Sequence, residues 1–451
     1  MKKNINKETI FKIIIFILYA IFNFILLLKH EPWRDEIHAW LMAKVYSIPE
    51  LFAASRFDGH PILWHLILMP FAKLNFPIIT LNIISYILVM VSAYLFLFKT
   101  NFSILFKLIV LFTIPFTYTY SAISRNYSLI LLLLVIIGIF YNKRYDKPII
   151  YSILICLLIH THSLAWGIVA GLTITFHFVE IYKNFIKKEP VKNIKKVVIG
   201  LFLIVFNTLL VVYELYGTTN SDYGHYIGDY VIYIVSMLCL ILVSLLLCSI
   251  WTKKYWKEFI VITISYAFQI IVYTCFYSSI LYQRLILIFV LLLFYLILLN
   301  SSGLEKKRLD IICIVYLLFV CLFALKPFVE NLVSDVKYNY SSAIEMADYI
   351  NNELPQDSTI LIDASIIGQS IIPYLNTAKF YDIAYNTYVD CANVSHDRQR
   401  IIDALANFSD YSGNYLIICN NLVELNNNDA KLVFETGNSI INEHFTLYYV
   451  Y

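Results

Sequence analysis

The chain is poor in charge, glycine and proline, and each shortage excludes a class of protein. Charged residues make up 14% of the 451 residues and hydrophobic residues 60%, whereas soluble domains carry about 25% charged residues. This balance, with a mean hydropathy of +0.71, excludes a soluble domain and indicates a polytopic membrane protein. The 12 Gly form neither a P-loop nor a GxGxxG pattern, so no nucleotide site is indicated.

Three further absences narrow the class of protein. The eight Cys show no CxxC spacing, and six of them lie in apolar segments, which indicates small core residues rather than a metal or redox site. The net charge of +3 is too small to indicate nucleic acid as a partner. The first apolar stretch is followed by no small-residue cleavage site, so we expect it to remain as an anchor.

Clusters of lysine and arginine orient the chain, because basic residues prefer the cytoplasmic ends of membrane spans. They lie within residues 2–12, 143–147, 183–196, 253–257 and 306–308 and place the N-terminus in the cytoplasm. The stretches between them predict about 11 spans, at 11–28, 77–98, 103–122, 126–143, 148–161, 164–182, 197–216, 230–251, 259–276, 279–300 and 309–327.

Residues 61–75 are also apolar, but a crossing there would break the parity of the basic clusters. We therefore interpret them as an interfacial or re-entrant helix. Twelve spans with a cytoplasmic C-terminal domain remain the alternative.

The predicted loops place the working face outside the cytoplasm. The longest cytoplasmic loop is about 183–196, too short to hold a nucleotide-sugar domain, whereas the first outer loop runs from 29 to 60. We expect a transmembrane domain at 1–330 and a small extracytoplasmic α/β domain at 331–451. Strands are predicted at 359–363, 379–385, 415–419 and 445–451, and helices at 341–351 and 396–407.

The first outer loop concentrates polar chemistry at the membrane surface. Residues 31–38 read Glu-Pro-Trp-Arg-Asp-Glu-Ile-His, so the acidic pair Asp35 and Glu36 sits just beyond the first span. A second acidic position, Asp58, precedes His60 in the same loop. Solvated loop carboxylates are common, but the clustering of Asp35 and Glu36 with Trp, Arg and His favours a site.

Four short motifs on this face carry a family resemblance. They are WRDE at 33–36, GHP at 59–61, SRNYSL at 124–129 and TH at 161–162. Their order and placement resemble the GT-C membrane glycosyltransferases, and more narrowly the protein mannosyltransferase and aminoarabinose transferase relatives that use polyprenyl-phosphate sugars. The match covers about residues 10–300. The chain departs from the family at Ile62, where a second Pro is frequent, and at Ser163, where an aromatic often follows Thr-His.

The resemblance implies inverting transfer of a sugar from a polyprenyl-phosphate donor to a glycan, lipid or protein outside the cytoplasm. A phosphate leaving group needs cations to absorb its charge, and the acceptor hydroxyl needs a base. By resemblance Asp35 is that general base and Glu36 orients the sugar or acceptor. Arg125 would hold the phosphate, because a guanidinium offers a planar fork of donors.

Further substrate-binding positions are predicted around these residues. Arg284 is a second phosphate candidate, because a charge a few residues inside a span usually faces a cavity. The remaining predicted substrate-binding residues are Trp33, Asp58, His60, Tyr127 and His162. No cofactor is indicated with certainty; a divalent cation between Asp35, Asp58 and the phosphate stays open, although no tight ligand spacing marks a metal site.

Two readings compete with a glycosyltransferase of the cell membrane. A lipid or glycan transporter or flippase without transferase activity would explain many spans and no nucleotide site. It predicts charged or Gly/Pro-broken spans near the bilayer midplane, whereas this chain keeps its acids at the rim. A non-catalytic scaffold that presents the C-terminal domain would leave the 31–38 cluster without a purpose.

Overall fold

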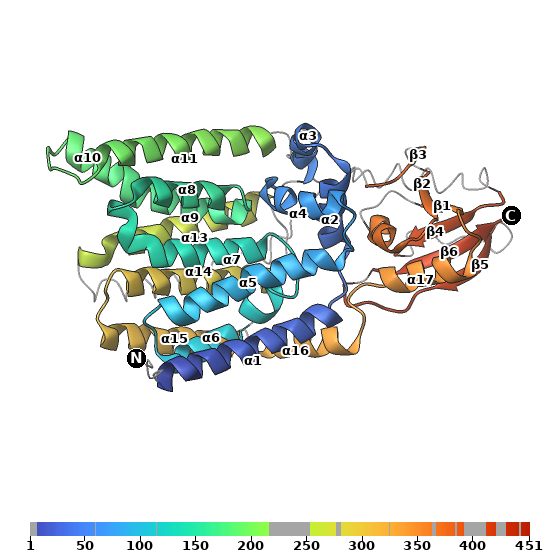
Figure 1. Cartoon of the computed structure of the whole chain (residues 1–451), viewed down its shortest axis with the longest axis horizontal. Coiled ribbons are helices and arrows are strands. Elements are labelled where there is room, and N and C mark those ends of the chain that lie inside the picture. Colours follow the sequence, from blue (N-terminus) through green and yellow to red (C-terminus); the bar gives the residue numbers. More distant parts are fainter. Residues whose placement is uncertain are drawn as a thin grey trace, which may run out of the picture.

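The computed structural model is a bundle of long helices with a sheet domain at one end (Figure 1). It describes residues 7–58, 60–113, 115–215, 253–276, 281–323, 325–362, 367–383, 386–391, 412–420, 430–441 and 443–451. Within these ranges, five helical stretches are long and apolar enough to cross a membrane, namely Lys7–Lys29, Ile79–Lys99, Tyr127–Tyr145, Ser163–Phe185 and Ile194–Leu215. Shorter apolar helices occupy Pro148–Ile159 and Ile288–Ser301. The chain is a multi-pass membrane protein, as its composition predicts.

Within the described residues, helices lie at the positions of the predicted spans, although only the five stretches above are long and apolar enough to cross a membrane by themselves. The helices of the bundle are α1 (Lys7–Lys29), α5 (Ile79–Lys99), α6 (Ile104–Leu111), α7 (Tyr127–Phe140), α8 (Pro148–Ile159), α9 (Trp166–Thr173), α10 (Val179–Phe185), α11 (Ile194–Leu215), α13 (Trp256–Phe276), α14 (Leu281–Ser301) and α15 (Lys306–Phe323). Single 3-10 or π turns occupy Pro115–Thr119, Tyr141–Tyr145, Ser163–Ala165, Ile174–Phe178 and Lys253–Tyr255. The predicted span 230–251 lies outside the described residues.

One predicted span is broken. The apolar stretch 103–122 forms only the eight-residue α6 and then a π-helical turn at Pro115–Thr119. Pro115 has no backbone N–H to donate to an earlier carbonyl, and Thr113 turns its hydroxyl onto the Val110 carbonyl at 2.6 Å. Hydropathy alone does not register either effect.

Close helix contacts in the bundle depend on small residues. Gly167 and Gly171 lie one turn apart on α9, which packs against α13. A Cβ at Gly171 would lie 2.7 Å from the carbonyl oxygen of Val261, and one at Gly167 would lie 2.9 Å from that of Ser265. Such small-residue stripes let helix backbones approach closely inside membranes.

Three short helices cover one end of the bundle, which we call the sheet end because the C-terminal domain also lies there (Figure 1). They are α2 (Arg34–Val45), α3 (Ile48–Asp58) and α4 (Leu63–Lys73). At 1.5 Å per residue α4 is about 16 Å long, roughly half of the bilayer's apolar core. α4 is therefore too short to cross that core by itself, as the interfacial interpretation of residues 61–75 expects.

The C-terminal domain is a mixed six-stranded sheet with helices. After α16 (Leu325–Lys337) and α17 (Ala343–Glu353) come β1 (Thr359–Ile362), a 3-10 segment (Gly368–Tyr374), β2 (Lys379–Asp382), β3 (Thr387–Tyr388), β4 (Tyr415–Cys419), β5 (Ala430–Glu435) and β6 (Phe445–Val450). The strand order is β3-β2-β1-β4-β6-β5. β1 is parallel to β2 and β4, and the other pairs are antiparallel.

The α/β prediction for this domain is confirmed, although it missed two strands. All four predicted strands and the helix at 341–351 are present, within a few residues of their predicted bounds. β3 has only two residues, and β5 is an edge strand with largely exposed side chains, so neither shows a strong apolar alternation. The predicted helix 396–407 lies outside the described residues.

The C-terminal domain docks on the first loop. The Gln369 side-chain amide lies 2.9 Å from Nδ1 of His38 in α2, and the Arg34 N–H donates to the Glu443 carboxylate at 3.1 Å. Both contacts place the domain on the same side of the bundle as residues 29–60. They are incompatible with the twelve-span alternative, which puts the two on opposite sides.

Candidate functional site

An ion pair between Asp35 and Arg125 forms the centre of the site at the sheet end. Arg125 Nη1 donates to Asp35 Oδ2 at 2.6 Å, although the two residues are 90 positions apart. Asp35 lies in the first turn of α2, where the helix dipole favours a carboxylate, and Arg125 lies just before α7. Their side chains are 24% and 18% exposed, so the pair remains open to an incoming molecule.

The second arm of the Arg125 fork faces His60. Arg125 Nη2 lies 3.3 Å from His60 Nε2, while His60 Nδ1 lies 3.2 Å from the Asp58 carboxylate. Assigning the ring proton to Nδ1 lets His60 donate to Asp58 and accept from Arg125. Burial alone would lower the pKa of Arg125, but Asp35 and other negative neighbours raise it, so the guanidinium stays charged.

Three imidazoles surround Asp58 at the end of α3. Besides His60, His38 Nε2 lies 3.6 Å and His65 Nε2 lies 3.9 Å from its carboxylate oxygens. Burial alone would raise the pKa of Asp58, but His60 and the other imidazoles hold it well below its usual range. Burial also lowers the pKa of His65 to about 4, so this ring is neutral at physiological pH.

His162 and Tyr127 complete a wall beside the guanidinium. The His162 ring centroid lies 4.8 Å from that of His60 and 5.6 Å from that of Tyr127, and the Tyr127 ring centroid lies 5.6 Å from Cζ of Arg125. The Leu164 N–H donates to His162 Nδ1 at 3.0 Å, which caps the 3-10 turn Ser163–Ala165. Burial holds the pKa of His162 far below its ordinary value, so Arg125 is the cation of this wall.

Glu36 lies behind the pair rather than within it. Its side chain is fully buried, and both carboxylate oxygens are occupied. One accepts the backbone N–H of Ser124; the other accepts the N–H of Trp33 at 3.2 Å and faces His30 Nε2 at 3.0 Å. Glu36 thus caps α2 and ties its first turn to the segment that carries Arg125.

The two other predicted substrate-binding residues are Trp33 and Arg284. The Trp33 ring centroid lies 6.3 Å from that of Tyr340 and 5.0 Å from Cζ of Arg34, so Trp33 faces the start of the C-terminal domain. Arg284 belongs to α14, but its side chain lies outside the described residues.

The structure therefore brings together six predicted residues, which are Asp35, Asp58, His60, Arg125, Tyr127 and His162. Sequence reasoning missed the contacts of His38 and His65 with Asp58. The helical spacing from Asp35 to His38 was a usable signal for one of them. It also missed Gln369 and Glu443, which reach the first loop from more than 300 positions away and leave no local signal.

The central charged groups of the site are the Arg125 guanidinium and the Asp35 carboxylate. In the part of the chain that the structure describes, no group of three or more His, Cys, Asp and Glu is arranged to hold a metal ion. The arrangement instead offers one fixed guanidinium for an anion and one accessible carboxylate for a proton.

Comparison with known proteins does not assign the chain to a family. No protein-family model matches the chain, and no curated protein matches it.

Proposed function

We propose that the protein is a GT-C-type membrane glycosyltransferase with about 11 spans. It moves a sugar from a polyprenyl-phosphate donor to a hydroxyl of a glycan, lipid or protein on the outer face of the cell membrane. The observation that carries the proposal is the accessible pair of Asp35 and Arg125, 2.6 Å apart at the sheet end of the bundle.

Asp35 acts as the general base. It takes the proton of the acceptor hydroxyl as that oxygen bonds to the anomeric carbon of the sugar. The bond from this carbon to the phosphate oxygen breaks on the opposite face, and the phosphate leaves with the electron pair. A single displacement of this kind inverts the anomeric centre, and Asp35 then returns its proton to water.

Arg125 stabilises the leaving phosphate. A fixed donor aimed at developing charge needs no reorganisation during the reaction, and His60, held by Asp58, fixes the second arm of the guanidinium. When the donor phosphate binds Arg125, it competes with Asp35 for the guanidinium and leaves the carboxylate available as a base.

A lipid donor fits the surroundings of the site. A cavity of about 550 Å³ is lined by residues of α8, α9, the π turn Ile174–Phe178, α11 and α13 and is almost wholly apolar. Its wall includes Trp166, which lies four residues after His162 in the sequence. The indole N–H of Trp166 donates to the Ile159 carbonyl at 3.1 Å. Such a cavity suits a prenyl chain whose phosphate lies at Arg125.

The test uses purified protein in liposomes with a polyprenyl-phosphate hexose labelled at the anomeric carbon and a panel of hydroxyl acceptors. The proposal predicts release of one polyprenyl phosphate per sugar transferred, with inverted configuration in the product. Movement of intact donor across the bilayer without phosphate release would instead establish the flippase alternative. A retained configuration would exclude the single displacement.

A further inference from the structure

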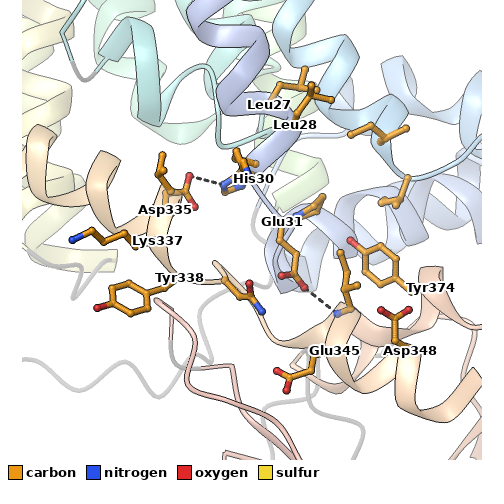
Figure 2. A pocket seen from close by; sticks show the side chains of 17 residues that line it. Leu27, Leu28, His30, Glu31, Asp335, Lys337, Tyr338, Glu345, Asp348 and Tyr374 are labelled. Carbon is orange, nitrogen blue, oxygen red and sulfur yellow. Dashed lines mark hydrogen bonds and ion pairs between the residues drawn. The ribbon is translucent and has the colours of Figure 1, made fainter. Parts of the chain in front are cut away.

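A chain of buried ionisable groups connects the C-terminal part of the molecule to the proposed site. Asp335 Oδ2 on α16 lies 3.3 Å from Nδ1 of His30, and Nε2 of the same ring lies 3.0 Å from the Glu36 carboxylate. The three side chains are at most 1% exposed. Figure 2 shows Asp335 and His30 facing each other where α1 ends.

Glu36 connects His30 to both members of the reactive pair, Asp35 and Arg125. It is the neighbour of Asp35 in the first turn of α2, and it accepts the backbone N–H of Ser124, the neighbour of Arg125. A shift of the Glu36 carboxylate would therefore change the separation of Asp35 and Arg125. Misplacement of about 1 Å can cost around 100-fold in rate.

His30 is held as a cation between two carboxylates. Burial alone would lower the pKa of His30, but Glu36 and Asp335 raise it to about 10. The Tyr340 ring, at 4.4 Å between centroids, covers the imidazole, and burial raises the pKa of this phenol. Glu31, beside His30, is tied to the Ile344 N–H at 3.0 Å (Figure 2).

The arrangement is costly as a purely structural device. Oδ1 of Asp335 is buried and has no hydrogen-bond partner among the described residues. A buried ion pair of this kind often stabilises a fold less than apolar packing would, and an unsatisfied carboxylate oxygen adds to the cost. A role besides stability would account for the presence of Asp335 in this arrangement.

We propose that Asp335 is a positioning residue for sugar transfer, acting through His30 and Glu36 to set the separation of Asp35 and Arg125. This inference rests on the proposed function. Asp335 does not touch the reacting atoms, because with His30 it lines a separate cavity of about 680 Å³ beneath the C-terminal domain whose lining includes neither Asp35 nor Arg125 (Figure 2).

The test compares Asp335→Asn with Asp348→Asn, an exposed residue of α17 that lines the same cavity. We expect Asp335→Asn to lower kcat by about 10- to 100-fold while the KM for the polyprenyl-phosphate donor changes less than about threefold, since phosphate binding is retained. The alkaline limb of its pH profile should move to lower pH, because His30 loses one of its two carboxylates. Asp348→Asn should behave as wild type.

Asp335→Asn with wild-type kcat and pH profile would overturn the inference. A measurement without turnover covers the case in which this variant does not fold. In wild-type protein labelled with ¹⁵N-histidine, the signal absent from His30→Gln should remain that of an imidazolium at pH 8, and a neutral His30 would also overturn the inference. If wild-type protein transfers no sugar, the proposed function fails, and this titration still tests the buried chain by itself.

Discussion

Two arginines, one at each end of the helix bundle, show what distinguishes a site from a support. Arg144, opposite the sheet end, lies between aromatic faces, with Cζ 3.6 Å from the Tyr141 ring centroid and 4.6 Å from that of Tyr145. Its Nη1 donates to the Tyr141 carbonyl at 2.6 Å. Arg125 instead pairs with the Asp35 carboxylate, and both side chains are partly exposed. Both charges are stabilised, but only Arg125 shares its donors with groups that can exchange protons or be displaced.

The largest expected difference between the two ends comes from replacing each arginine by lysine. Arg125→Lys removes the fork that reaches both Asp35 and His60, so we expect transfer to fall by about 100- to 1000-fold with little change in melting temperature. Arg144→Lys loses stacking on aromatic rings, worth about 1–2 kcal/mol, and should lower the melting temperature while kcat is kept. Equal losses of kcat in the two variants would remove the distinction.

At the sheet end, the pH dependence of stability should report the charge of His30. The pKa of His30 is raised from 6.5 to about 10, so its contribution to stability is complete below pH 6.5 and is lost as the pH rises through about 10. Between pH 7 and pH 10 the melting temperature of the wild type should therefore fall, by an amount on the order of 5 °C. His30→Gln should show a flatter profile. Parallel profiles for the two proteins would contradict a charged His30.

A smaller effect is expected at Glu443, which accepts the Arg34 N–H and, at 2.6 Å, the Ser341 hydroxyl. Burial raises the pKa of Glu443 from 4.5 to about 7, so its contribution to stability is complete below pH 4.5 and is lost as the pH rises through about 7. Glu443→Gln removes the charge and keeps one acceptor oxygen for the Arg34 N–H, while its amide NH₂ faces the Ser341 hydroxyl as a donor. Its melting temperature should gain on that of the wild type between pH 5 and pH 8, by about 2 °C. A difference that does not vary with pH would exclude this titration.

The sequence predicts most residues of the site but not the contacts that hold them in place. The motifs around Asp35, Arg125 and His162 mark residues that the fold does bring together, because each lies at the same end of the bundle. The contacts of Asp335 and Gln369 depend on how a distant domain docks, which no local pattern encodes.

The fold was predictable to a similar degree. Long apolar runs and the strands of the C-terminal domain are both recognisable from the sequence. The break at 103–122 depends on Pro115 and Thr113, within a stretch whose hydropathy is otherwise that of a span.

The central claim is that Asp35 removes the acceptor proton during sugar transfer. Its most direct test is the rate of sugar transfer from a labelled polyprenyl-phosphate hexose by purified Asp35→Asn protein. Asp146→Asn is the control, because Asp146 pairs with Lys192 at 2.5 Å on an exposed surface away from the site. The account predicts a loss of about 1000-fold or more for Asp35→Asn and an unchanged rate for Asp146→Asn. Normal transfer by folded, membrane-inserted Asp35→Asn protein would contradict it.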